Sequence, residues 1–283
     1  MRPSDEVLAW VSEVAGAVVT GVTGLRAGGT PWIVRFADAP AVVLRTADGD
    51  HDRFGVEVAA LAAAEEHGLP APRLIAFNPL LPAMAMTALA GTSKLTGPPS
   101  TSRLRALGAV TARLTAPMTP TDALPLRAKP LDSEEFTARS PAQVEALAAV
   151  ADYEPAPARP VLVHGDLWQG NTVWDGDTCL GIVDWEYAGV GPHGVDLGSL
   201  RCDVATSVGV EAVDEVLAGW EAEAGGPAAE VAYWDVMAGL STPADMADWL
   251  PVLHDQGRTD LDGPTATARR DAFLRTAIVA LGR

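Results

Sequence analysis

The segment between residues 161 and 185 constrains the fold more than any other part of the chain. A short apolar strand runs directly into a polar loop at residues 164–171, and Asp175-Gly176-Asp177 lies between the two apolar runs that follow. An Asp-Gly pair between apolar runs is a strong signal for a β-hairpin. Because such a hairpin returns the chain beside the loop that precedes it, three side chains should meet at one mouth, those of Asp166, Asn171 and Asp184.

The chemistry of these side chains is that of metal ligands and of a general base. Mg²⁺ prefers oxygen ligands and takes only one or two from the protein beside substrate phosphates, which makes Asn171 and Asp184 candidate ligands. Asp166 is a candidate general base for a hydroxyl that attacks a phosphoryl group. Taken singly, each residue also has a structural interpretation as a turn former or, for His164, as a hydrogen-bonded core residue. A hydrolase metal site of His164, Asp166 and Asp184 stays open, although a single His does not favour it.

The pattern of the rest of the chain changes near residue 90. Before it, short β-branched runs predict an antiparallel meander, and apolar spacings of three and four predict one main helix. The expected strands are 18–22, 32–36, 41–45, 74–77 and 83–86, and the expected helix is 54–67. After it, the expected helices are 102–114, 144–150, 196–206, 210–224, 228–240, 243–254 and 265–281. This order predicts an α+β chain.

The net charge of the chain limits the classes of partner that we expect it to bind. Of its 283 residues, 37 are acidic and 20 are Lys or Arg, a formal net charge of −17. The only lysines are Lys94 and Lys129 and the arginines are scattered, so no basic run could neutralise a row of phosphates. This argues against nucleic acid and against an anionic membrane surface. An acidic field attracts cationic small molecules, although excess acid also keeps proteins soluble.

The chain carries no sign of export. No run of about 18 apolar residues occurs, and Arg2, Asp5 and Glu6 lie where a signal peptide would need a basic head and an apolar run. We therefore expect a cytoplasmic protein. Two cysteines cannot form a disulfide framework, and neither Cys179 nor Cys202 has a neighbour at zinc-ligand spacing, so we expect free thiols.

Two motifs carry a resemblance to a known family. His164-Gly165-Asp166-Leu167-Trp168-Gln169-Gly170-Asn171 and Gly181-Ile182-Val183-Asp184-Trp185-Glu186 are similar to signatures of the aminoglycoside phosphotransferase family of small-molecule kinases. The similarity includes residues 57–72, 86–91 and 194–198. It implies a bilobal protein-kinase-like fold. Residues 1–90 would form an N-terminal nucleotide-binding lobe with an antiparallel sheet and one main helix. A hinge at about 86–91 would lead to a mostly helical C-terminal lobe, 92–283, with the catalytic loop and the acceptor site.

The resemblance also assigns the nucleotide side. Arg45 takes the place of the strand-three lysine that touches the phosphates, and Glu57 is its expected partner. Arg grips carboxylate and phosphate through its planar fork, but it is not interchangeable with lysine. The other expected contacts are Gly29 and Thr30 over the triphosphate and the backbone of Thr87 and Leu89 against the purine.

In the family the loop residues have defined roles. The resemblance implies that Asp166 acts as the base, that Asn171 and Asp184 hold Mg²⁺, and that the nucleotide is ATP or GTP. His164 and Asp196 are expected to support the loop.

Together these roles predict a phosphotransferase that moves a γ-phosphoryl group to a hydroxyl of a small molecule. The family and the acid excess favour a cationic acceptor, aminoglycoside-like or a basic peptide antibiotic, and therefore a resistance enzyme. Acidic candidates for the acceptor pocket are Glu186, Asp203, Asp235, Asp245 and Asp248.

Two alternatives share these motifs. A metabolic kinase for a fructosamine, an amino sugar or choline would have the same site, and residues 165–168 look particularly like those of fructosamine kinases. A catalytically inactive, nucleotide-binding pseudokinase is suggested by Arg45 in place of lysine and by the irregular glycine turn at 24–30. The acceptor, the choice of nucleotide and the oligomeric state stay open.

Overall fold

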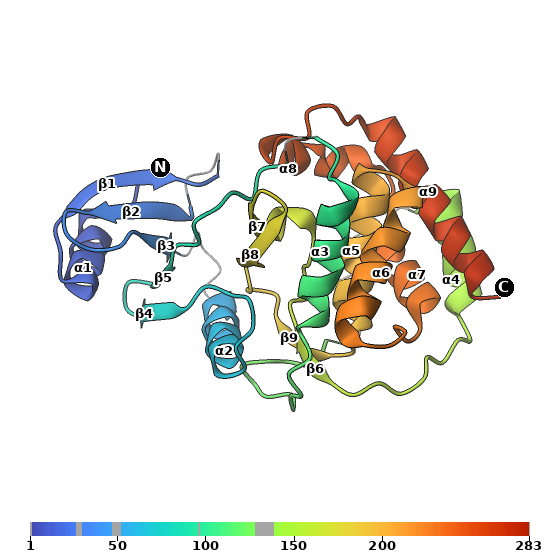
Figure 1. Cartoon of the computed structure of the whole chain (residues 1–283), viewed down its shortest axis with the longest axis horizontal. Coiled ribbons are helices and arrows are strands. Elements are labelled where there is room, and N and C mark those ends of the chain that lie inside the picture. Colours follow the sequence, from blue (N-terminus) through green and yellow to red (C-terminus); the bar gives the residue numbers. More distant parts are fainter. Residues whose placement is uncertain (1, 27–29, 47–51, 96, 128–138, 283) are drawn as a thin grey trace.

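The N-terminal part is a five-stranded antiparallel sheet. The computed structural model describes residues 2–26, 30–46, 52–95, 97–127 and 139–282. The strands are β1 (Val19–Gly24), β2 (Trp32–Phe36), β3 (Val42–Thr46), β4 (Leu74–Asn78) and β5 (Ala83–Thr87), in the order β1-β2-β3-β5-β4 (Figure 1). Branched side chains pack well on a pleated surface, which is why these runs form strands. Arg45 on β3 pairs in register with Met84 on β5.

Two helices accompany the sheet. Helix α1 (Asp5–Ala15), which the sequence analysis did not expect, buries Val11 against the sheet core. Helix α2 (Asp52–Glu66) places Leu61 in one buried cluster with Met84 of the sheet and with Leu162 and Trp185 of the helical part. This shared core fixes how the strands face the loop at 164–171.

The rest of the chain is mostly helical (Figure 1). Its helices are α3 (Thr101–Ala112), α4 (Pro141–Val150), α5 (Gly194–Ser207), α6 (Val213–Ala224), α7 (Val231–Leu240), α8 (Leu250–Asp255) and α9 (Gly263–Ala280). Helices α3 and α6 approach closely through two glycines. A Cβ at Gly108 would lie 1.9 Å from the Val216 carbonyl oxygen, and one at Gly219 would lie 2.0 Å from that of Arg105.

Short strands hold the polar loop between them. Strand β6 (Val161–Val163) pairs with β9 (Gly189–Gly191), and β7 (Thr172–Asp175) forms a hairpin with β8 (Thr178–Ile182). A 3₁₀ turn, Gln169–Asn171, leads into β7. The loop therefore leaves one buried strand pair and enters the other.

The predicted fold class is confirmed, with local differences. The expected helix 243–254 is divided into a 3₁₀ turn, Met246–Trp249, and α8, where Pro251 occupies the first turn and lacks an N–H for a continuous helix. Strand β9 was not expected because Gly-Val-Gly offers a single apolar side chain. Both cysteines are free, as expected. The division into lobes at 86–91 stays a prediction.

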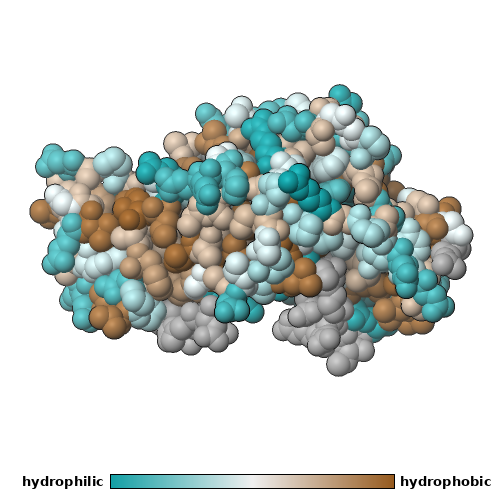
Figure 2. All heavy atoms as spheres, turned by 90° about the horizontal axis from the view of Figure 1, so that it is seen from below, coloured by the Kyte–Doolittle hydropathy of each residue, from teal (hydrophilic) through white to brown (hydrophobic). Residues whose placement is uncertain are grey.

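The face of the molecule seen in Figure 2 is of mixed polarity. Figure 2 shows hydrophilic residues spread along the whole of one face, with apolar patches between them. None of the helices in the described ranges is long and apolar enough to cross a membrane.

Candidate functional site

The polar loop is held by Asp196 in the first turn of α5. Asp196 Oδ2 accepts a hydrogen bond from the His164 N–H at 2.7 Å, and Oδ1 accepts one from the Gly165 N–H at 2.9 Å. The carboxyl group is buried, which raises its pKa, while His164 and the two N–H groups oppose the rise. His164 Nε2 also lies 2.9 Å from the Val183 carbonyl oxygen. These contacts fix the backbone directly before Asp166.

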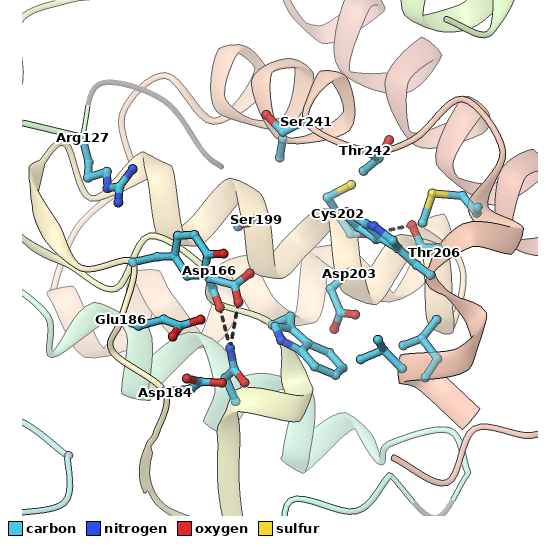
Figure 3. A pocket seen from close by; sticks show the side chains of 18 of the residues that line it. Arg127, Asp166, Asp184, Glu186, Ser199, Cys202, Asp203, Thr206, Ser241 and Thr242 are labelled. Carbon is cyan, nitrogen blue, oxygen red and sulfur yellow. Dashed lines mark hydrogen bonds between the residues drawn. The ribbon is translucent and has the colours of Figure 1, made fainter. Parts of the chain in front are cut away.

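Asp166 and Asn171 lie side by side on this loop. Asn171 Nδ2 donates hydrogen bonds to the Asp166 carbonyl oxygen at 2.9 Å and to Asp166 Oδ2 at 3.2 Å (Figure 3). Burial and the charge of Asp184 raise the pKa of Asp166 to about 7, against the hydrogen bond from Asn171. A carboxyl group that titrates near neutral pH is suited to take a proton from a hydroxyl.

Asp184 follows β8, and its carboxylate accepts hydrogen bonds from two arginines. Its backbone has a positive φ of 70°, which Asp tolerates better than most residues. Oδ1 accepts from Arg45 Nη1 at 2.7 Å, and Oδ2 accepts from Arg26 Nη2 at 3.2 Å. Burial acts to raise the pKa of Asp184, but the guanidinium groups of Arg45 and Arg26 outweigh it and lower the pKa. Environment thus separates the pKa values of Asp166 and Asp184, as is common in acid–base sites.

Arg45 connects the sheet to these carboxylates. Nη1 donates to Glu57 Oε2 at 2.8 Å as well as to Asp184, and Nη2 donates to Glu186 Oε2. Burial acts to lower the pKa of Arg45, but Glu57, Asp184 and Glu186 together raise it. Glu57 is only 2% exposed, and burial raises its pKa to about 7 although Arg45 opposes the rise. The two ends of the fork reach acceptors that a single ammonium could not reach together.

The oxygens of Asn171 and Asp184 converge on one point. The same Arg26 Nη2 donates to Asn171 Oδ1 at 3.3 Å and to Asp184 Oδ2 at 3.2 Å. One cationic group therefore already contacts both. An amide and a carboxylate oxygen beside a phosphate site are the donor set that Mg²⁺ takes, so the residues fit this metal.

Of the other residues expected to contact a nucleotide, the structure describes all but Gly29. Gly29 lies outside the described residues, and Thr30 Oγ1 is buried with no hydrogen-bond partner in the described part of the chain. The Thr87 N–H donates to the Arg73 carbonyl oxygen at 2.9 Å, and the Leu89 carbonyl accepts from an N–H two residues later at 3.0 Å.

A cavity of about 520 Å³ adjoins the loop. It extends from Asp166, Asn171 and Asp184 toward helices α5, α7 and α8 (Figure 3). Of the acidic candidates for the acceptor pocket, Glu186 and Asp203 line it.

The remaining acidic candidates do not line this cavity. Asp235 is 4% exposed, and its carboxylate accepts three hydrogen bonds from Arg201 at 2.9 to 3.3 Å. Asp245 and Asp248 are exposed, and Asp245 caps a 3₁₀ turn by accepting from the Ala247 N–H at 2.9 Å. The sequence could not choose among these candidates because a helical sequence does not show which way a single acid points.

Sequence reasoning missed two residues. Arg26, on the loop after β1, donates hydrogen bonds to the side-chain oxygens of Asn171 and Asp184. It lies in a glycine-rich segment, and the glycines were the only feature of that segment that the sequence pattern singled out. Gln169 is buried and donates from its N–H and its Nε2 to Asp203 Oδ2, at 3.2 and 2.8 Å. Its position inside the loop motif was the available signal.

Solved structures share this fold over nearly the whole chain. Macrolide 2'-phosphotransferase MphH from Brachybacterium faecium is 21% identical with a TM-score of 0.63, covering 94% of this chain and 98% of that one. Choline kinase LicA from Streptococcus pneumoniae is 13% identical with a TM-score of 0.63, covering 97% and 98%. Spectinomycin phosphotransferase APH(9)-Ia, bound to AMP, is 12% identical with a TM-score of 0.64, covering 96% and 97%.

The family itself follows from sequence. A comparison with curated proteins finds no match. The model of the phosphotransferase enzyme family, however, matches residues 22–240, a segment that holds most of the sheet, Arg45, the polar loop and Asp184. With this match over most of its length and a protein-kinase-like fold, the chain belongs to the phosphotransferase enzyme family.

Proposed function

We propose that this phosphotransferase moves the γ-phosphoryl group of ATP or GTP to a hydroxyl group of a small cationic molecule, with Mg²⁺ as cofactor. One observation carries the proposal. Asp166, with a pKa near 7, is hydrogen-bonded to Asn171, and the oxygens of Asn171 and Asp184 converge beside it at the end of one cavity.

Asp166 is the proposed catalytic base. Its carboxylate orients the acceptor hydroxyl and takes its proton as the phosphoryl group is transferred. A positioned base contributes about 10²–10⁴ in rate. Asn171 and Asp184 would hold Mg²⁺, which neutralises charge on the phosphates when it is bound.

We place the nucleotide between a lobe of residues 1–90 and a lobe of residues 92–283. Arg45, held by Glu57, would steady the phosphates. The Thr87 carbonyl and the Leu89 N–H would contact the purine. Related structures named as AMP complexes support nucleotide binding at this fold.

The acceptor is proposed at a coarser level. The names of the similar structures give a macrolide, spectinomycin and choline as substrates of those proteins. Two acceptor classes therefore remain, a hydroxylated cationic antibiotic, for which this chain would be a resistance enzyme, and a metabolic amine or amino sugar.

A nucleotide-consumption assay with a panel of acceptors tests the proposal. ATP or GTP is supplied with Mg²⁺ and with cationic antibiotics, amino sugars, choline or fructosamines, and we expect acceptor-dependent release of the diphosphate. Nucleotide binding in a thermal-shift experiment without turnover on any acceptor would instead support a pseudokinase. Zn²⁺ binding without nucleotide affinity would support a metal-dependent hydrolase.

A further inference from the structure

The wall that the helices contribute to the cavity is largely apolar. The helices contribute Ala238, Val252 and Leu253 to it, the 3₁₀ turn contributes Met246 and Trp249, and the loop adds Trp168. Cys202 adds to this character, because burial raises the pKa of its thiol to about 12 and keeps it uncharged. Among the described lining residues, Asp203 is the only acid that a helix contributes. A ligand with several cationic groups would therefore meet one carboxylate on this wall.

Three hydroxyl groups of the wall already donate hydrogen bonds to the backbone. Thr206, Ser241 and Thr242 each donate to a backbone carbonyl oxygen three or four residues earlier, at 2.8, 3.0 and 2.7 Å. A hydroxyl has one proton to donate and two lone pairs that accept. Thr206 and Ser241 can therefore accept hydrogen bonds from a ligand more readily than they can donate them, whereas Thr242 already accepts from Gln143 and Arg270.

Asp203 offers one oxygen to the cavity. Its Oδ2 is held by the two hydrogen bonds from Gln169, whereas its Oδ1 has no hydrogen-bond partner in the described ranges. Both Asp166, from the loop, and Asp203, from α5, line the cavity, and Figure 3 shows Asp203 to the right of Asp166. Burial raises the pKa of Asp203, against the hydrogen bonds from Gln169 and the charge of Arg258. A carboxylate in such surroundings is stabilised when a cation pairs with it.

The arginines that line the cavity lie elsewhere. Arg26 and Arg53 each pair with a carboxylate of the catalytic centre, at 3.2 and 4.0 Å. In the view of Figure 3, Arg127 lies on the opposite side of Asp166 from Asp203. Near the catalytic centre, arginines thus alternate with the carboxylates of Asp166, Asp184 and Glu186, whereas Asp203 is the single negative group against the apolar wall.

Building on the proposed function, we propose that Asp203 binds the one ammonium group of the acceptor and that the rest of the acceptor is a bulky apolar body carrying the hydroxyl. Trp168 and Trp249 would add cation–π attraction for an alkylated ammonium. Further ammonium groups would lie against apolar side chains, against arginines, or beside Asp184 and Glu186, which already pair with arginines. Asp203 is therefore a specificity residue for amphipathic monocations over polycations.

The test uses two probes of the same shape. A dimethylamino cyclohexanol carries one ammonium, and the corresponding isopropyl cyclohexanol carries none. Calorimetric titration of the nucleotide-free protein should show the amine binding about ten- to a hundredfold more tightly, as expected for a hydrogen bond to a charged group. Asp203→Asn should remove this preference, whereas Asp248→Asn, which removes an exposed acid outside the cavity, should keep it.

Other outcomes overturn the proposal. Equal weakening of both probes by Asp203→Asn would show that Asp203 only holds Gln169 in place. Tighter binding of the polycation kanamycin than of the amine would contradict the choice of a monocation. Because binding is measured without nucleotide, an amine preference without phosphoryl transfer would contradict the proposed function alone. Transfer to the amine that Asp203→Asn leaves unchanged would contradict this inference alone.

Discussion

Replacing Asp196 by Asn tests how the catalytic loop is positioned. The carboxylate accepts two backbone hydrogen bonds, at 2.7 and 2.9 Å, from His164 and Gly165. An Asn side chain has one oxygen, so one N–H would face an NH₂ group and stay unpaired inside the protein. Hydrogen bonds to charged groups contribute about 1.5–3 kcal/mol each, and a neutral one about 0.5–1.5 kcal/mol. After allowing for the lower desolvation cost of Asn, we expect a loss of about 2–3 kcal/mol in the free energy of unfolding.

Urea unfolding followed by circular dichroism measures this loss. For a chain of this size it corresponds to a melting temperature lower by about 4–10 °C. Because the loop carries Asp166, a displacement of about 1 Å should also reduce kcat about a hundredfold. Asp38→Asn, at an exposed position, is the matched control and should change neither. A loss below about 0.5 kcal/mol, typical of surface substitutions, together with an unchanged kcat, would refute the reasoning about Asp196.

Three further predictions concern the charged network. Arg45→Lys should lower the free energy of unfolding in urea by about 1–2 kcal/mol, because one ammonium cannot reach both sets of acceptors of the fork; an unchanged midpoint would contradict this. Asp184→Asn should lower the pKa of Asp166 from about 7 in carbon NMR titrations of the nucleotide-free protein, because a neighbouring negative charge is lost; a rise would contradict it. Asp235→Ala should cost about 3–5 kcal/mol of unfolding free energy, since Arg201 stays buried without its carboxylate; a change typical of an exposed acid would contradict it.

Much of the fold could be predicted because local signals agree with it. The Asp-Gly turn at 175–176 forms the β7–β8 hairpin, and the strands and the main helix before residue 90 follow their apolar spacing. The meeting of Asp166, Asn171 and Asp184 follows from the same hairpin. These features depend on residues close in sequence, where turn chemistry and side-chain period decide the outcome.

Other features depend on long-range contacts. Arg26 reaches Asn171 and Asp184 across more than 140 positions, and no local pattern marks such a contact. Asp235 is buried only because Arg201 lies on a neighbouring helix. Helix α1, by contrast, has local signals that sequence analysis could have used. Ser4 caps it, acidic residues occupy its first turn, and Gly16 ends it in the left-handed conformation.

Most of the acidic residues do not line the cavity, where a polycationic acceptor would need them. Of the 37 acidic residues in the sequence, four are among the described residues that line the cavity, Asp166, Asp184, Glu186 and Asp203. Three of these belong to the proposed catalytic centre. Most of the acidic residues therefore lie outside the cavity, and in our proposal the acceptor site relies on Asp203.

Transfer of labelled phosphate to an acceptor is the most direct test of the central claim, that Asp166 is the base of a phosphotransferase. Wild-type protein and Asp166→Asn are incubated with ATP labelled in its γ-phosphoryl group, Mg²⁺ and the dimethylamino cyclohexanol, and the labelled product is separated and counted. We predict labelled acceptor with the wild type and a rate lower by about 10²–10⁴ with the variant, while calorimetry shows that both bind ATP equally. A labelled product formed at the same rate by the variant, or label released only as free phosphate by the wild type, would contradict the account.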